Sequence, residues 1–471
     1  MAHDPRETQS GAQRPTLLLP VENQVRELDA KLLFALAAAE RGYPCVLGAR
    51  ATLHQEAARL PRGVYVAKSA RALSERMFRI YRGLGSEIVA WDEESLVRNP
   101  NAAFWYRRRL SAAALAHVRA FFAWGEDDAA QIRAFPGGGV PPVHATGNPR
   151  LDLTRPELRA TFADDVAALR ARHGDFLLVN TNFGLVNHYV DAMSGAPPLP
   201  PGEHTPEERA AAEALVVYRG AMFDAFREMV PTLAKAFPDL AIVVRPHPVE
   251  KHAPWEAIAR QHANVAVAQK GNVLPWLLAA RALVHSGCTT GVEAYALGVP
   301  ALAYEPIPGA GFDSELPNAL SRRVADLDAL VAEVRAVLAG APSAGDAERD
   351  ARAARHMASL SGELACDRIL DVLDDLYAAG RPLAPARPLA RAAAWLHAEG
   401  RAVFKRARAR IPGNRNSADY QRHRFPGVTE ETLRASAARF GVLLGRFAGV
   451  TIRERAPDVF DVRPPRRAAE R

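Results

Sequence analysis

Two short polar stretches in the second half of the chain carry residue types that bind anions. The first is Arg245, Pro246, His247 and Pro248, which directly follow the apolar run at residues 240–244. Because ligands of open α/β sheets bind at the carboxyl ends of the strands, a guanidinium and an imidazole placed there suit a phosphate group. The flanking prolines fix the backbone around the imidazole. We predict that Arg245 and His247 bind phosphate; the alternative is a surface turn that ends a strand.

The second stretch, residues 283–304, is predicted to run from a strand through a small polar turn into a short helix and a second strand. Gly298 occupies the position of a helix C-terminal glycine, and apolar residues at helical spacing precede it. A hydroxyl-rich turn that opens a helix presents free backbone N–H groups and the positive end of the helix dipole, which suit a phosphate. The alternative is that the hydroxyls merely cap the helix. The candidate phosphate ligands here are Ser286, Thr289 and Thr290.

Carboxylates in the first third of the chain could act on a substrate. Glu93 and Glu94 follow the predicted strand at residues 87–91, where a carboxylate can serve as a base or a nucleophile. The alternative is an acidic helix N-terminus, which the helix dipole favours. Four further polar residues follow the predicted first strand, at residues 16–20, and are expected to line the same cleft unless they are an exposed helix start: Glu22, Asn23, Arg26 and Glu27.

Two separate alternations of strands and helices must position these residues. The first has predicted strands at residues 16–20, 44–48, 63–66, 87–91, 120–124 and 142–146, and it lacks the GxGxxG pattern of dinucleotide-binding domains. The second has strands at 176–179, 240–244, 265–267 and within 283–304, and helices at 206–236, 325–340 and 350–378. We therefore predict an α/β protein with two Rossmann-like doubly wound domains that face a cleft. The predicted segments are a disordered tail at 1–14, domains at 15–150 and 151–378, and a basic helical extension at 379–471.

Composition narrows the function classes. The net charge of +7 over 471 residues suits anionic substrates or a membrane face, and is too small to indicate nucleic acid binding. The three cysteines fit no metal or disulfide spacing, which predicts a reducing, cytoplasmic location. No apolar run approaches the 18 residues or so that a membrane span requires. Basic residues around Trp395 and Phe404 predict weak contact with an anionic membrane; the alternative is a solvated helical extension packed on the second domain.

The motifs together resemble a known family. VVRPHP, HSGCTTGVEAYALGVPALAY, LLVNTNFG, HATGNPRLDL and the C-terminal HRFPGVT look like the bacterial surface carbohydrate biosynthesis proteins of capsule and lipopolysaccharide synthesis. These proteins are similar to glycosyltransferases of the two-Rossmann-domain (GT-B) architecture. Related His-Pro and Ser/Thr pairs occur in sialyltransferases, Kdo transferases and glycerophosphotransferases, which use cytidine nucleotides.

The resemblance implies a sugar transferase with a CMP- or CDP-linked donor, no separate cofactor and no metal. On it, the donor would be bound by Asn182, Arg245, His247, Ser286, Thr289, Thr290 and Glu293, with Glu293 facing ribose or base hydroxyls. The transferred sugar would be Kdo or a similar acid, and the acceptor a glycan or lipid-linked glycan. Two alternatives stay open: a UDP-sugar 2-epimerase-like enzyme, and a non-catalytic assembly protein that binds nucleotide-sugars.

Overall fold

The computed structural model describes residues 14–98, 101–195, 199, 204–309, 311–340, 346–378, 383–411, 414 and 416–465. Of the predicted tail at 1–14, only Arg14 lies within these ranges. The chain forms two compact units. Unit 1 comprises Met1–Glu93, Arg109–Thr161 and Ala354–Arg471, and unit 2 comprises Glu94–Arg108 and Phe162–Ala353.

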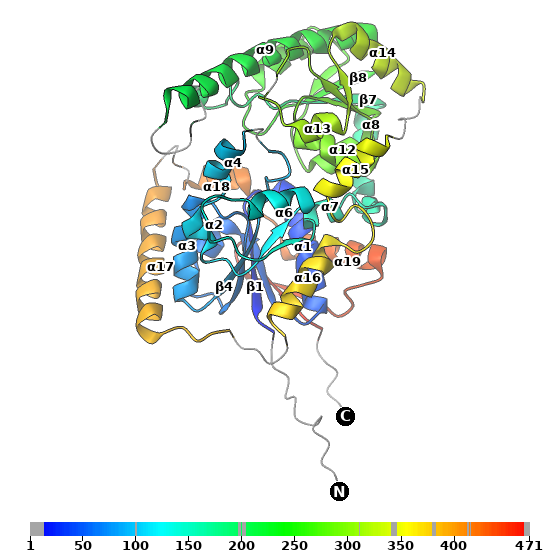
Figure 1. Cartoon of the computed structure of the whole chain (residues 1–471). Helices are drawn as coiled ribbons and strands as arrows, with labels where there is room; N and C mark the ends of the chain where they lie inside the picture. Colours follow the sequence, from blue (N-terminus) through cyan, green and yellow to red (C-terminus); the bar gives the residue numbers. More distant parts are fainter. Residues whose placement is uncertain are drawn as a thin grey trace. The chain divides into compact units, whose positions relative to one another are not determined.

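Unit 1 is built on an eight-stranded sheet with the order β13-β14-β2-β1-β3-β4-β5-β6 (Figure 1). Strands β1 to β6 pair in parallel, whereas β13 and β14 form an antiparallel hairpin against the edge of β2. The order β2-β1-β3-β4-β5 reverses direction between β1 and β3, and this switch point is where doubly wound sheets bind ligands. The strands are β1 (Thr16–Val21), β2 (Cys45–Ala49), β3 (Gly63–Ala67), β4 (Glu87–Trp91), β5 (Phe121–Ala123), β6 (Val143–Ala145), β13 (Thr451–Ala456) and β14 (Val459–Arg463).

The helices of unit 1 cover its sheet. Strands β2 and β3 are buried at every position, which explains why their sequences are small or apolar throughout rather than alternating. The helices are α1 (Gln24–Glu40), α2 (Arg50–Gln55), α3 (Glu75–Gly83), α5 (Ala112–Leu115), α6 (Glu126–Arg133), α7 (Pro149–Asp152), α16 (Ala365–Leu376), α17 (Pro388–Ala409), α18 (Ala418–Arg424) and α19 (Glu430–Leu444). Helices α4 (Ala102–Arg109) and α15 (Ala347–His356) cross between the units.

Unit 2 has a six-stranded parallel sheet with the order β12-β11-β10-β7-β8-β9. Numbered within the unit, this is the 6-5-4-1-2-3 order of the Rossmann fold, and its switch point lies between β7 and β10. Its strands are β7 (Phe176–Asn180), β8 (Ala241–Arg245), β9 (Val265–Val267), β10 (Ala282–His285), β11 (Ala301–Tyr304) and β12 (Arg322–Val324).

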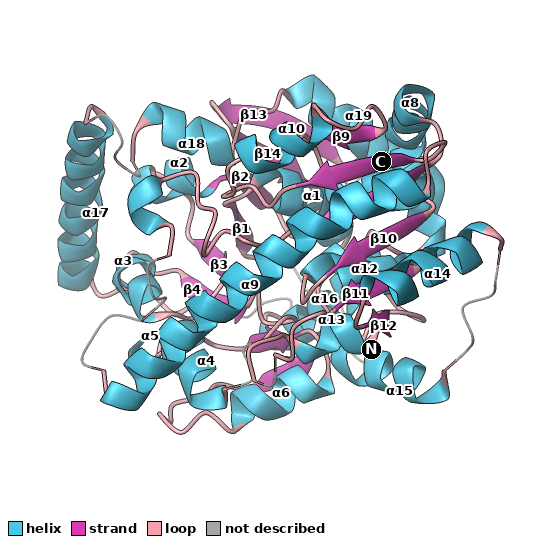
Figure 2. Ribbon diagram, turned by 90° about the horizontal axis from the view of Figure 1, so that it is seen from above, coloured by secondary structure: helices cyan, strands magenta, loops and turns pink. Residues whose placement is uncertain are grey.

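Helices and a large apolar core hold the second sheet. The long helix α9 (Pro206–Ala236), which crosses Figure 2, begins with a capping box at Thr205 and Glu208. Its Met222, Phe226 and Met229 join the core that underlies the sheet. The other helices are α8 (Ala163–His173), α10 (Ala253–Ala259), α11 (Val273–Ala279), α12 (Thr289–Leu297), α13 (Glu315–Ala319) and α14 (Leu327–Leu338).

The C-terminal part differs from its prediction. Residues 379–471 were expected to be a helical extension, but β14 pairs with β2 and adds a hairpin to the first sheet. A Cβ at Gly48 would lie 2.4 Å from the Asp458 carbonyl oxygen, so a glycine lets the hairpin approach. Helix α17 packs on α2 and α3 of unit 1 rather than on the second domain (Figure 1; Figure 2).

The unit boundaries also differ from the predicted domains at 15–150 and 151–378. Unit 1 continues to Thr161 and resumes at Ala354, so it includes α16. Asp152 links these segments, because its carboxylate accepts hydrogen bonds from the backbone N–H groups of Ala365 (2.8 Å) and Cys366 (2.9 Å) at the start of α16. The predicted helix at 350–378 is two helices, α15 and α16.

The predicted fold class is confirmed: the chain is an α/β protein with two Rossmann-like units, each with its own parallel sheet. Among the described residues, no helix combines the length and the apolar character that crossing a membrane requires.

Candidate functional site

The carboxyl edge of the unit 2 sheet gathers most of the predicted phosphate ligands. Arg245 ends β8, and its register partner on β7 is Asn180, the last residue of that strand. On the other side of the switch point, β10 ends at His285, and Ser286 follows it. The parallel pairing therefore brings Asn180, Arg245 and Ser286 to one edge of the sheet, where doubly wound folds bind ligands.

Several buried polar atoms at this edge make no hydrogen bond with any described residue. They include both amide atoms of Asn180, the hydroxyl of Ser286 and Nε of Arg245. Asn180 and Ser286 are 3% and 4% exposed, so water reaches them poorly. An unsatisfied buried polar atom costs about 1–3 kcal/mol, and native proteins contain few of them. Their concentration at a switch point indicates that the edge is built for a polar ligand.

Arg245 is a strongly desolvated cation. The Nη2 nitrogen of Arg245 donates hydrogen bonds to the backbone carbonyls of Gln269 (3.2 Å) and Gly271 (2.6 Å). Burial lowers the pKa of Arg245 to about 10, and the charge of Glu293 offsets this only in part. Carbonyl dipoles orient the side chain but do not replace an anion. A bound phosphate would compensate the desolvated charge.

The His247 loop is held by a carboxylate that the sequence analysis missed. Glu250 accepts hydrogen bonds from the backbone N–H groups of His247 (3.0 Å) and Phe183 (3.0 Å) and from the Thr181 hydroxyl (2.7 Å). Burial raises the pKa of Glu250, although these hydrogen bonds oppose the shift. The Val249 N–H donates to Nδ1 of His247 at 3.3 Å, which places the proton of the neutral imidazole on Nε2. His247 thus has a fixed backbone and carries the proton of its neutral imidazole on Nε2.

Helix α12 opens without the side-chain cap that the alternative interpretation expects. Its N-cap residue is Cys288, whose side chain makes no capping hydrogen bond, and Thr290 donates to the Cys288 sulfur at 3.1 Å. Thr289 and Thr290 are the first two helical residues and are half-buried. The first turn therefore keeps the anion-binding character of a helix N-terminus. Among the other predicted ligands, Glu293 is buried in this helix, whereas Asn182 makes no hydrogen bond or ion pair with a described residue.

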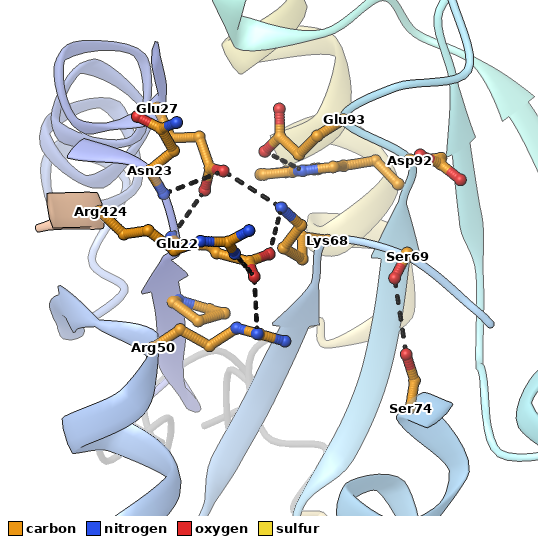
Figure 3. A network of polar contacts seen from close by, with 12 residues as sticks. Glu22, Asn23, Glu27, Arg50, Lys68, Ser69, Ser74, Asp92, Glu93 and Arg424 are labelled. Atoms are coloured by element: carbon orange, nitrogen blue, oxygen red, sulfur yellow. Dashed lines mark hydrogen bonds and ion pairs between the residues drawn. The ribbon is translucent and has the colours of Figure 1, made fainter. Parts of the chain in front are cut away.

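In unit 1, the carboxyl edge of the sheet holds a compact ionic cluster (Figure 3). The Lys68 ammonium, just after β3, lies between the carboxylates of Glu22 (2.6 Å) and Glu27 (3.2 Å). Glu22 also pairs with Arg50 at 2.7 Å and with Arg424. Burial alone would raise the pKa of Glu22 and of Glu27, but the neighbouring cations outweigh it and lower both pKa values, that of Glu27 strongly. The Glu22–Lys68 pair connects the ends of β1 and β3 at the switch point.

The same cluster extends to Glu93. Lys31, 2% exposed, contacts Glu27 (2.8 Å), Glu93 (3.1 Å) and the Pro20 carbonyl (2.6 Å). The Trp91 indole N–H donates to the same Glu93 oxygen at 2.8 Å. The second oxygen of Glu93 has no hydrogen-bond partner among the described residues. Glu93 is therefore anchored through one oxygen, while the other is buried and lacks a hydrogen-bond partner among the described residues.

The structure separates the remaining candidates of unit 1. Asn23 donates its backbone N–H to Glu27 at 3.3 Å, so Glu22, Asn23 and Glu27 lie together. The backbone N–H of Arg26 donates to the Asn23 carbonyl at 3.2 Å, but the Arg26 side chain forms no hydrogen bond or ion pair with a described residue. Glu94 is exposed and belongs to unit 2, unlike Glu93. The alternative of an acidic helix start at 92–95 is wrong, because these residues form a turn.

The residues of these two clusters that the sequence analysis missed include Lys31, Lys68, Asn180 and Glu250. Lys68 and Asn180 occupy the ends of predicted strands, so the rule that placed Arg245 and Glu93 could have identified them. Lys31 and Glu250 carry no such signal. Among the described residues, no group of three or more His, Cys, Asp or Glu side chains is arranged to hold a metal ion.

Comparison with known proteins finds no family model that matches the chain. No curated protein matches it either. Solved structures with a related architecture include a UDP-N-acetylglucosamine 2-epimerase (11% identity, TM-score 0.49, 78% of this chain and 96% of that one). Another is the Methanocaldococcus jannaschii UDP-GlcNAc 2-epimerase in complex with UDP-GlcNAc and UDP (12%, 0.45, 76% and 99%). A third is the wall teichoic acid polymerase TagF (11%, 0.48, 78% and 89%). Likeness at this level does not determine the reaction or the ligand of this chain.

Proposed function

We propose that the protein is a glycosyltransferase that moves a sugar from a nucleotide-linked donor to a glycan acceptor, with the donor phosphates bound at the unit 2 switch point. The observation that supports this most is the group of buried polar atoms without partners at the ends of β7, β8 and β10. The desolvated guanidinium of Arg245 and the uncapped N-terminus of α12 lie at the same edge of the sheet. The oxygens of a diphosphate or phosphodiester would accept hydrogen bonds from the guanidinium, from the polar side chains and from the backbone N–H groups of the helix.

Each donor-site group would act on a part of the nucleotide. Arg245 and the Nε2–H of His247 would bind phosphate oxygens, and the first turn of α12 would add backbone N–H groups and its dipole. Ser286 and Asn180 would complete the hydrogen bonds of the same ligand. The sequence resemblance favours a cytidine nucleotide and a Kdo-like sugar, without a separate cofactor.

The transfer would break the bond between the anomeric carbon and the donor phosphate oxygen. The acceptor oxygen would form the new bond to that carbon, and its proton would pass to a carboxylate. The departing nucleotide would carry the negative charge, which Arg245 and α12 would stabilise. Of the two predicted carboxylates, Glu93 suits this role better than the exposed Glu94, because it is positioned by Trp91 and Lys31.

Two other functions fit the same fold. A UDP-sugar 2-epimerase-like enzyme would convert its UDP-sugar without an acceptor. A non-catalytic assembly protein would bind a nucleotide-sugar and form no product. Incubation of the full chain with CMP-, CDP- and UDP-linked sugars, with and without a glycan acceptor, separates the three by the product formed.

Helix α17 supports the further proposal that the enzyme lies on an anionic membrane beside a lipid-linked acceptor. Its buried Ala394, Ala398 and Ala402 face unit 1, and the exposed Leu389, Leu396 and Val403 recur every seven residues on the opposite side. An apolar stripe beside basic residues suits the headgroup region of an anionic bilayer.

The donor site is tested by His247→Ala with calorimetry against CMP and CDP. Loss of a hydrogen bond to a charged phosphate should weaken nucleotide binding by roughly 10- to 150-fold. Thr289→Ala should have a smaller effect, because the backbone N–H groups and the dipole of α12 remain. His262→Ala, a half-buried histidine of the same unit, is the matched control and should bind as the wild type does. Wild-type affinity of His247→Ala would show that the donor binds elsewhere.

A further inference from the structure

Unit 1 contains a cavity that the donor site does not account for. It encloses about 420 Å³ and opens at the carboxyl ends of β1, β2 and β3, next to the switch point of that sheet. Among the described residues that line it, six side chains are cationic and one, Glu22, is a carboxylate. The cations are Arg50, Lys68, Arg71, Arg401, Lys405 and Arg424.

The C-terminal helices complete this cavity. Helix α17 packs against α3 so closely that a Cβ at Gly83 would lie 2.6 Å from the Ala394 Cβ. On that helix, Arg401 donates to the His54 carbonyl at 3.4 Å, and Lys405 donates to the Asn416 side-chain oxygen at 2.6 Å. The neutral partners hold both side chains at the cavity without neutralising them.

The cationic charge of the cavity exceeds what its own carboxylate can balance. Glu22 already pairs with Lys68, Arg50 and Arg424. In the part of the chain that the structure describes, Arg71, Arg401 and Lys405 form no ion pair with a carboxylate. Burial, followed by the repulsion of neighbouring cations, lowers the pKa values of Arg401 and Lys405. A bound anion would relieve both effects.

We propose that this cavity binds a phosphorylated sugar, and that Arg401 and Lys405 of α17 contact its phosphate. Neutral polar side chains on the wall suit the sugar hydroxyls, and the volume lies within the usual range for small-molecule sites. The neutral polar side chains on the wall of the cavity are those of Ser69, Ser74, Asn416, Tyr420 and Gln421. Ser69 and Ser74 lie next to the ionic cluster in Figure 3. That this sugar is part of the glycan acceptor rests on the proposed function. The binding of a phosphorylated sugar in the cavity does not depend on the proposed function.

The test is calorimetry of the full chain with glucose 1-phosphate, inorganic phosphate and methyl glucoside at low salt. Glucose 1-phosphate should bind more tightly than inorganic phosphate, and methyl glucoside should bind far more weakly than both. Removal of one charged contact should weaken glucose 1-phosphate binding by roughly 10- to 150-fold in Arg401→Ala and in Lys405→Ala. Arg406→Ala, an exposed arginine of the same helix outside the cavity, is the matched control and should change the affinity less than twofold.

Two further measurements separate this site from the donor site. CMP affinity should be unchanged in Lys405→Ala, and glucose 1-phosphate affinity should be unchanged in His247→Ala. The inference is overturned if Arg401→Ala and Lys405→Ala bind glucose 1-phosphate as the wild type does, or if Arg406→Ala loses as much. Loss of CMP binding in Lys405→Ala would also overturn the inference, because it would show that the cavity binds a nucleotide. A failure of His247→Ala to affect CMP would count against the donor site alone.

Discussion

Among single residues, Glu93 has the arrangement most suited to chemistry. One of its oxygens accepts from Trp91 and pairs with Lys31, while the other has no described hydrogen-bond partner. The neighbouring Asp92 is held by Arg109, whose Nε donates to it at 2.9 Å, and Glu94 is exposed. Three adjacent acidic residues thus have three different environments, and that of Glu93 combines an anchored oxygen with a buried oxygen that has no hydrogen-bond partner among the described residues.

Substitution of Glu93 should separate chemistry from binding. Glu93→Gln keeps the size of the side chain but removes the basic oxygen, so turnover in an acceptor-dependent assay should fall by about 10²–10⁴-fold. CMP affinity should stay within about twofold of wild type, because the donor site lies in unit 2. Glu94→Gln is the control and should turn over normally.

The loss of a buried charge at Glu93 could itself unfold the protein, since breaking a buried ion pair costs about 3–5 kcal/mol. Glu93→Asp keeps the charge beside Lys31 but withdraws the oxygen, so it should remain folded in a thermal melt and still lose turnover. Normal turnover in both Glu93 variants would make this carboxylate part of the ionic cluster only.

The sheet edge at which a residue lies was predicted correctly for residues that end or follow a strand, whereas the roles of these residues stay predictions. Arg245, Ser286, Glu22 and Glu93 all occupy such positions, and parallel pairing brings them to the predicted edges. Their partners could not be assigned in the same way. Lys31 reaches the cluster from the second turn of α1, and Glu250 acts from a loop, so only tertiary structure shows what each contacts.

Among the elements, α12 depends on one close contact for its position. A Cβ at Gly291 would lie 2.4 Å from Nε2 of His285, whose ring is fully buried and bonded to Ser321 at 2.8 Å. Burial lowers the pKa of His285 to about 3, so this ring packs as a neutral group. The first turns of α12 can therefore pack this closely against His285 because residue 291 has no side chain.

Gly291→Ala should consequently be destabilising. Glycine to alanine in a helix ordinarily stabilises by up to about 1 kcal/mol, but overpacking a buried ring costs about 1–3 kcal/mol. Urea unfolding should show a net loss, and the displaced helix should weaken CMP binding. Gly220→Ala, in α9 with no atom within 4 Å of the new Cβ, is the matched control and should be neutral or stabilising. A Gly291→Ala variant as stable as Gly220→Ala would contradict this account of α12.

Elements whose partners are close in sequence were predicted well. Strands β1 to β11 and helix α9 lie within a few residues of their predicted positions, because each belongs to a local strand–helix repeat, whereas the short strand β12 was not predicted. The hairpin of β13 and β14 was missed because β14 pairs with β2, about 400 residues earlier in the chain. No local pattern in the sequence of β14 identifies such a distant partner.

At the scale of the whole molecule, each unit presents cationic groups at the switch point of its own sheet. In unit 2 these are a single guanidinium and a helix N-terminus, and in unit 1 they are a group of lysines and arginines. These groups place positive charge locally at each switch point of a chain whose net charge is +7. This distribution is consistent with the two anionic ligands that we propose.

Basic and apolar residues also combine on the outer side of α17. Leu396 and Phe404 are 65% and 53% exposed, and the Arg408 guanidinium lies 5.4 Å from the Phe404 ring centre. Each basic side chain near an anionic bilayer contributes about 1 kcal/mol, and burial of an apolar side chain adds about 1.5–3 kcal/mol. Together they would hold the enzyme at a membrane weakly and reversibly.

Co-sedimentation with phosphatidylglycerol-containing vesicles tests this attachment. The wild type should bind at low salt and dissociate as the salt concentration rises, because the electrostatic part is screened within about a Debye length. Leu396→Gln and Phe404→Gln should each lower the bound fraction, since the apolar contribution of one side chain corresponds to about a tenfold change in partitioning. Val442→Gln is the matched control, because Val442 is 83% exposed on α19 and lies outside the stripe. Equal binding to neutral and anionic vesicles would exclude the electrostatic mechanism, and unchanged binding of both α17 variants would exclude this helix as the attachment surface.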